Sequence, residues 1–176
     1  RLGNILNDVT IAEPYLRNAN IIGFDMKSLS WQATNLPSGN PNGIDARTIC
    51  ALARYAGISD RVSFFGIYEI SSTPMMDQLL AQIVWYFIEG FNNRFDEYPV
   101  LTSIGFTKYT VALSDIKMVF YQSEKSNRWW MEITNDSHLD NKSKTTTLLA
   151  CTREDYEHAK SDIIPERWYN AIKRMH

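Results

Sequence analysis

The stretch that decides the fold is NIIGFDM, at residues 20–26. It is a short apolar run that ends at an acid, and it predicts a buried parallel strand whose carboxyl end presents Asp25. The stretch RVSFFGIYEI, at residues 61–70, predicts a second strand that ends near Glu69. Ligands bind at the carboxyl edge of open α/β sheets, so we expect the chemistry of the protein at this edge.

The residues between and after these strands predict two helices. Asp45 is a suitable N-cap for the first helix, and Gly57 is placed to end it. A wide apolar stripe predicts the second helix from about Pro74 to Phe95. The order strand, helix, strand, helix predicts right-handed crossovers in a parallel sheet. Residues 27–44 are rich in Ser, Asn, Pro and Gly without a period, which predicts a long loop.

The chain changes character after Pro99, so we expect one domain over residues 1–99 and a second region over 100–176. Before the first strand, residues 4–18 have a weakly helical pattern that Pro14 limits. The second region predicts a small β-rich annex with hairpin breaks, followed by two terminal helices. Its expected strands are 108–113, 117–122, 128–133 and 147–151, its polar segment is 134–146, and its helices start near Arg153 and Pro165, the proline suiting a first helical turn.

Composition excludes several classes of function. Eighteen basic and twenty acidic residues give a net charge of −2, so no nucleic acid or anionic membrane partner is indicated. The apolar runs are too short to span a bilayer. Cys50 and Cys151 follow no metal spacing and favour a reducing cytoplasm. The chain starts at Arg1 without a leader, and we expect a cut point there rather than a natural start.

Two features have more than one interpretation. Asp25 and Glu69 can bind a divalent metal or a cationic substrate group. They can also end their strands simply because they reach solvent there. Trp129 and Trp130 beside Arg128 can form a stacking platform for a base or sugar. Alternatively, strand alternation packs one ring inward and leaves the other at a surface or interface.

These segments resemble the ureohydrolase family of arginases, agmatinases and formimidoylglutamases. Residues 23–43 (GFDMKSLSWQATNLPSGNPNG) resemble the family strand that ends in Phe-Asp-x-Asp and the Gly-rich loop after it. Residues 64–70 (FFGIYEI) resemble the next strand, and residues 78–91 (QLLAQIVWYFIEGF) resemble the helix that follows. The tail, with KYTVAL, VFYQSEKSNRWWMEI and PERWY, is similar to a formimidoylglutamase-like branch.

The resemblance implies a fold and an activity. The fold is a partial three-layer α/β/α parallel sheet of arginase type, of which this chain is the carboxy-terminal half. The activity is hydrolysis of linear amidines, such as formimidoylglutamate to glutamate and formamide in histidine catabolism, by a hydroxide that two Mn²⁺ ions activate. Asp25 matches a metal-binding carboxylate, and Glu69 matches the acid that contacts the substrate amidino group. Lys27 stands where the family has a second carboxylate, and an ammonium cannot ligate a cation.

The chain departs from the family in further places. The upstream Gly-Gly-x-His and Asp-Ala-His-x-Asp words are absent, and His138, His158 and His176 match no family ligand. The Asn-Pro that follows the closing Glu is replaced by residues 71–74 (SSTP). We therefore expect the isolated chain to be inactive and to need its missing N-terminal half or a second copy. The alternative is a non-catalytic scaffold that has lost its metals, and a third interpretation is a stand-alone binding module based on the aromatic annex.

Overall fold

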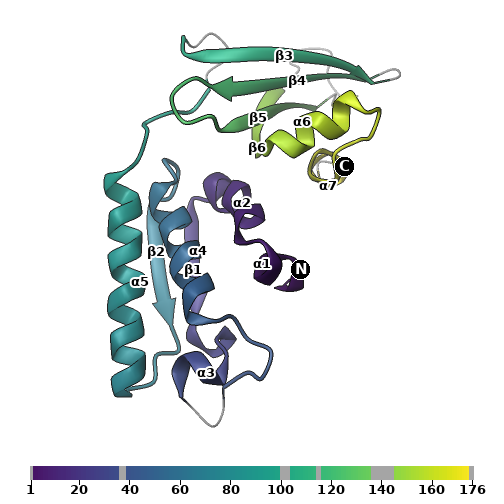
Figure 1. Ribbon diagram of the computed structural model, residues 1–176. Coiled ribbons are helices and arrows are strands. Elements are labelled where there is room, and N and C mark those ends of the chain that lie inside the picture. Colours follow the sequence, from purple (N-terminus) through teal and green to yellow (C-terminus); the bar gives the residue numbers. More distant parts are fainter. Residues whose placement is uncertain (1, 36–38, 100–103, 114–115, 136–144, 175–176) are drawn as a thin grey trace. The chain divides into compact units, whose positions relative to one another are not determined.

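The computed structural model describes residues 2–35, 39–99, 104–113, 116–135 and 145–174 (Figure 1). The chain divides into two compact units, Arg1–Asp96 and Glu97–His176. The first contains a parallel two-stranded sheet, and the second contains an antiparallel four-stranded sheet. The protein is therefore a mixed α/β structure.

The sheet of the first unit consists of β1 (Ile21–Asp25) and β2 (Phe64–Tyr68). The two strands are parallel, as the sequence predicted, with Ile21 opposite Phe64 and Asp25 opposite Tyr68. The expectation that β1 is buried throughout is wrong, because burial alternates along it. Ile22 is buried, whereas Ile21 is 70% exposed. One face of the sheet is therefore covered, and the other is open to solvent.

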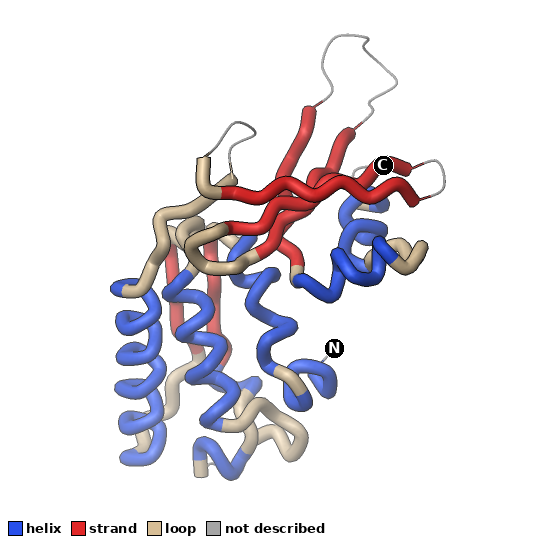
Figure 2. Tube along the Cα trace, turned by 45° about the horizontal axis from the view of Figure 1, so that its top comes forward, coloured by secondary structure: helices blue, strands red, loops and turns tan. Residues whose placement is uncertain are grey.

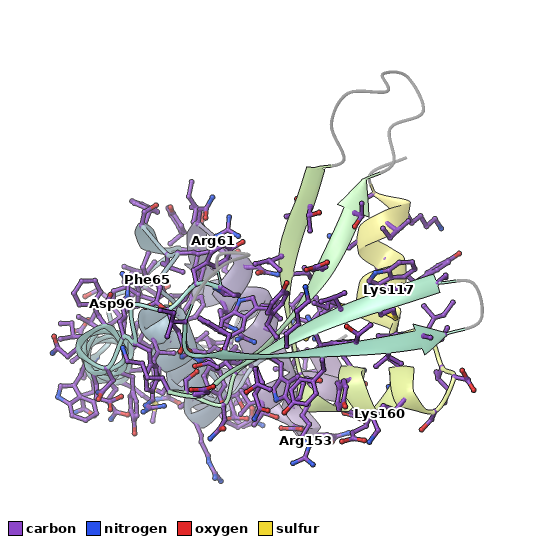
Figure 3. The ribbon with its side chains drawn as sticks, turned by 90° about the horizontal axis from the view of Figure 1, so that it is seen from above. Arg61, Phe65, Asp96, Lys117, Arg153 and Lys160 are labelled. Atoms are coloured by element: carbon purple, nitrogen blue, oxygen red, sulfur yellow. The ribbon has the colours of Figure 1, made fainter. Side chains whose placement is uncertain are left out.

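Two helices cover the buried face, α4 (Ala46–Ile58) and α5 (Pro74–Asn92). The ring of Phe65 stacks on Phe87 of α5 at 4.3 Å between centroids and meets the edge of Phe24 at 5.0 Å. Phe65 is labelled among the side chains of this unit in Figure 3. Phe24 is buried and the other two rings are partly buried, and these contacts contribute to the hydrophobic core of the unit.

Local signals start both helices. Asp45 is the N-cap of α4, as predicted, and its carboxylate accepts a hydrogen bond from Thr48 N at 2.8 Å. Thr73 is the N-cap of α5, and Pro74 lies in its first turn. Pro suits this position because the first helical N–H groups have no partner inside the helix. The helix ends at Asn92 rather than at Phe95.

The prediction that Gly57 ends the first helix is wrong. The helix continues to Ile58, and its C-cap is Ser59. Gly57 lies instead where α4 and α5 cross, and a Cβ atom there would overlap the carbonyl oxygen of Phe87. Gly90 of α5 lies at the same crossing, where a Cβ would overlap the carbonyl oxygen of Arg54. The two glycines allow the helix backbones to approach closely.

Short helices build the remainder of the first unit. Pro14 lies in the first turn of a helix that begins at Glu13, so no single helix runs through residues 4–18. The segment 27–44 is not without structure, because bridges join Leu29 to Ile44 and Ser30 to Asn40. Its residues 36–38 lie outside the described residues. The elements are α1 (Leu2–Asn7), η1 (Val9–Ala12), α2 (Glu13–Asn18), η2 (Met26–Ser28) and α3 (Trp31–Thr34).

The second unit is an antiparallel sheet with the strand order β3-β4-β5-β6 and two terminal helices. Figure 2 draws strands in red and helices in blue. The predicted strands and helices are present, although several strands are longer than their sequence patterns. The predicted break at 114–115 and residues 136–144 of the polar segment lie outside the described residues. The elements are β3 (Phe106–Leu113), β4 (Ile116–Ser123), β5 (Trp129–Asn135), β6 (Thr145–Cys151), α6 (Arg153–Lys160) and α7 (Glu166–Lys173), with Pro165 as the N-cap of α7 rather than in its first turn.

Both tryptophans of β5 are buried, on opposite faces of this sheet. Trp129 is 6% exposed and stacks on Tyr156 of α6 at 4.9 Å and on Tyr109 at 5.2 Å. Trp130 is 1% exposed and meets the ring of Phe106 at 5.6 Å. The expectation that one ring lies at a surface is therefore wrong, and neither ring is free to stack on a base or sugar.

Candidate functional site

The carboxyl edge of the parallel sheet begins at Asp25, the last residue of β1. Its carboxylate accepts a hydrogen bond from Lys27 N at 2.8 Å, and its carbonyl oxygen accepts one from the Ser28 hydroxyl at 2.7 Å. These bonds turn the chain sharply into η2. This is the local bonding by which Asp favours turns and N-caps. Asp25 therefore fixes the backbone of Lys27 at the end of the sheet.

Glu69 leaves the adjacent strand one residue after Tyr68, the residue that pairs with Asp25. Its φ is +57°, in the left-handed region that residues with a Cβ rarely adopt. Such conformations cost of order 1–3 kcal/mol and cluster at functional sites. The strained backbone at Glu69 therefore marks this end of β2 as a position worth testing.

An ion pair joins the two strand ends. Lys27 Nζ lies 2.7 Å from Glu69 Oε2, and both side chains are mainly exposed. The hydrogen bond to Glu69 raises the pKa of Lys27 above its ordinary value, and attraction to the Glu69 and Asp25 charges adds to the effect. The structure thus brings together Asp25, Lys27 and Glu69, the three residues that the sequence singled out. Their summed charge is that of one carboxylate.

The described residues do not fit a pair of metal ions at this edge. Lys27 has only donors and offers no lone pair to a metal, and it engages the carboxylate of Glu69. Within the described ranges, no three His, Cys, Asp or Glu side chains gather as a metal would require. His158 lies on α6 of the second unit, 3.8 Å from Glu154, while His138 and His176 lie outside the described residues.

Tyr68 was not predicted as a site residue, and its ring lies on the open face of the sheet. A Cβ at Gly23 would lie 2.9 Å from Tyr68 Cε2, and one at Gly66 would lie 2.5 Å from its hydroxyl oxygen. The ring therefore covers two glycines, and it is 51% exposed. Asp25 and Tyr68 are opposite each other in the parallel pair, and opposite residues point to the same face of a sheet. The ring of Tyr68 therefore lies on the same face as Asp25.

A second missed residue is Glu97, a buried carboxylate in the other unit. The hydroxyls of Ser123 and Ser126 donate hydrogen bonds to it, and Arg128 Nη1 lies 4.0 Å away. Ser123 Oγ also accepts hydrogen bonds from the backbone of Lys125 and Ser126. These bonds hold the turn between β4 and β5, so the cluster serves the fold and offers no open site.

Comparison with known proteins gives no match. No protein-family model, no curated protein and no solved structure is significantly similar to this chain. Across the part of the chain that the structure describes, no helix combines the length and the apolar character needed to cross a bilayer. The candidate site is therefore the edge formed by Asp25, Lys27 and Glu69.

Proposed function

We propose that the protein is a hydrolase of linear amidines of the ureohydrolase type, with formimidoylglutamate as its substrate. The carrying observation is the Glu69 carboxylate, which lies at the carboxyl edge of a parallel sheet and holds a cationic head group at 2.7 Å. An amidinium is a planar cation with several N–H donors, and it suits a carboxylate acceptor well. The substrate's amidino group would take the place that the Lys27 ammonium occupies.

The proposal assigns separate roles to the two acids. Glu69 binds and orients the amidinium. Asp25 lies at the end of the neighbouring strand and is the residue that would bind Mn²⁺, while Lys27 cannot. The proposal also includes a three-layer α/β/α fold of arginase type. It further includes a cytoplasmic location for the protein. The proposal requires that the remaining groups come from a further segment of the natural protein or from a second copy of this chain.

The test uses the full-length natural protein that contains this chain, supplied with Mn²⁺. Formamide release from formimidoylglutamate is measured, with agmatine and arginine as competing substrates. Substituting Glu69→Gln keeps the shape and removes the charge. Because a hydrogen bond to a charged group contributes about 1.5–3 kcal/mol, kcat/KM for the amidine falls roughly 10- to 100-fold.

The matched control is Glu154→Gln, which removes an exposed carboxylate on α6 of the other unit. This variant keeps the activity of the unchanged protein. Two results would contradict the proposal. One is the absence of amidine hydrolysis by the full-length protein with Mn²⁺, and the other is equal activity of the Glu69→Gln variant.

The second candidate function is a non-catalytic scaffold that keeps the fold without the metals. The observation that favours it is the ammonium of Lys27, which stands where the resemblance places a second metal-binding carboxylate and pairs with Glu69 instead. The upstream sequence decides between the two functions. If that sequence contains the His and Asp metal-ligand motifs of the family, Lys27 is a local variation. If those motifs are also substituted, the scaffold is favoured.

A further inference from the structure

We infer that Lys27 is a built-in counter-ion, which competes with external cations for the Glu69 carboxylate and thereby limits cation binding at this edge. The inference rests on the proposed role of Glu69 as a cation-binding group. It assigns to Lys27 a role that regulates that same site.

Lys27 is held so that its ammonium stays near Glu69. Its backbone N–H is bound by the Asp25 carboxylate at 2.8 Å. Met26, directly before Lys27, and Leu29, two residues after it, are 2% and 0% exposed, so they anchor the segment in the core. A ligand tethered in this way has a high effective concentration and competes strongly with free ligands.

The charges at the edge explain what this competition changes. With the ammonium in place, Asp25 and Glu69 share one neutralising charge, and the attraction to a further cation is weak. Without it, two carboxylates at neighbouring strand ends would attract a divalent cation with both charges. Lys27 therefore reduces the repulsion between the two carboxylates at the carboxyl edge and sets the affinity of this edge for cations.

The probe is Mn²⁺ alone, titrated into the full-length protein near neutral pH and at constant ionic strength. Free Mn²⁺ is followed by electron paramagnetic resonance. Substituting Lys27→Met keeps most of the length of the side chain and removes its charge. We expect Mn²⁺ to bind roughly fivefold or more tightly to this variant.

Three further variants isolate the cause. Adding Glu69→Gln to Lys27→Met abolishes the gain, because the freed carboxylate is then missing. Lys27→Arg keeps the cation and binds Mn²⁺ as the unchanged protein does. Lys108→Met removes a different lysine, whose Nζ lies 3.8 Å from Glu132 in the other unit, and has no effect.

The inference is overturned if Lys27→Met binds Mn²⁺ no more tightly, or if the gain survives the loss of Glu69. A merely structural ion pair would change stability without this dependence on Glu69. The outcome is separate from the proposed function. A Glu69-dependent gain without amidine hydrolysis leaves the counter-ion standing alone. If amidine hydrolysis depends on Glu69 but Lys27→Met binds Mn²⁺ no more tightly, only the proposed counter-ion role of Lys27 is rejected.

Discussion

Asp45 shows how one side chain sets the start of a helix. Its carboxylate accepts hydrogen bonds from both the backbone N–H and the hydroxyl of Thr48, each at 2.8 Å. Substituting Asp45→Ala leaves that N–H without its partner at the first turn of α4. We expect the free energy of unfolding to fall by about 1 kcal/mol, as measured by urea denaturation.

The same residue predicts a dependence on pH. Burial raises the pKa of Asp45, but the hydrogen bonds from Thr48 lower it by a larger amount. The pKa in the folded protein therefore lies below its ordinary value of 3.8. The carboxylate therefore contributes stability that is fully present above pH 3.8 and is lost as the pH falls through the lowered pKa. The stability difference from Asp45→Ala shrinks over that range, and a difference that stays constant into acid would contradict this assignment.

The sequence located the important acids, but it could not predict how they interact. The order strand, helix, strand predicts parallel pairing, and this pairing places Asp25 and Glu69 at one edge. The Lys27–Glu69 contact depends on two features of the backbone that the sequence pattern does not predict. One is the sharp turn that Asp25 imposes, and the other is the left-handed backbone of Glu69.

The contact between α4 and α5 depends on small residues at the crossing. Substituting Gly90→Ala places a methyl group against the carbonyl oxygen of Arg54 and within 3.0 Å of Ile58 N. Backbone atoms cannot move aside cheaply, so overpacking outweighs the gain in helix propensity. We expect a loss of about 1–3 kcal/mol, measured by thermal and urea unfolding.

Gly3→Ala is the matched control for this element. Gly3 lies in α1, and no atom lies within 4 Å of the position that its Cβ would occupy. The substitution is therefore neutral, or stabilising by up to about 1 kcal/mol. If both substitutions had the same effect, close helix packing would not be the reason for Gly90.

The structural role of a glycine near a helix end cannot be predicted from the sequence alone. A glycine near the end of an apolar helical pattern predicts a C-terminal cap, and this was the interpretation of Gly57. The same residue allows close approach of two backbones, and only the position of α5 distinguishes the two roles. Helix starts were more predictable, since the bonds of Asp45 and Thr73 to their own helices are local.

At the scale of the molecule, the first unit presents apolar surface on both of its outer sides. Ile21, Phe64 and Tyr68 are at least half exposed on the open face of the sheet. Parallel sheets are normally covered on both faces. Helix α5 carries a second apolar stripe away from the core, formed by Val84, Trp85, Ile88 and Phe91, each 44–61% exposed. A helix that is apolar on most of its circumference is typical of a buried position.

We therefore expect the isolated 176-residue chain to bind a hydrophobic dye and to self-associate as its concentration rises. Substituting Trp85→Gln together with Ile88→Gln reduces both effects, as measured by dye fluorescence and sedimentation velocity. Tyr169→Gln, at a residue 55% exposed on α7, is the control and changes neither. A monomeric chain that melts sharply and binds no dye would contradict this expectation.

The sequence predicted the mixed α/β class and the order of most elements. It could not predict that, among the described residues, the sheet of the first unit consists of two strands with one covered face. An apolar run such as IIGF has the same pattern in a strand covered on one face and in a strand covered on both. It also could not predict the burial of both Trp129 and Trp130, since alternation does not reveal whether the second face of a sheet is covered.

The two sheets also differ in how fast they can form. In the antiparallel sheet, Leu113 pairs with Ile116, so the paired residues of β3 and β4 are close in sequence. In the parallel sheet, Ile21 pairs with Phe64, and all of α4 lies between them. Closing the longer segment costs more chain entropy before any contact rewards it, so we expect β1 and β2 to join late in folding. The rim that holds Asp25 and Glu69 is therefore among the last parts of the chain to be completed.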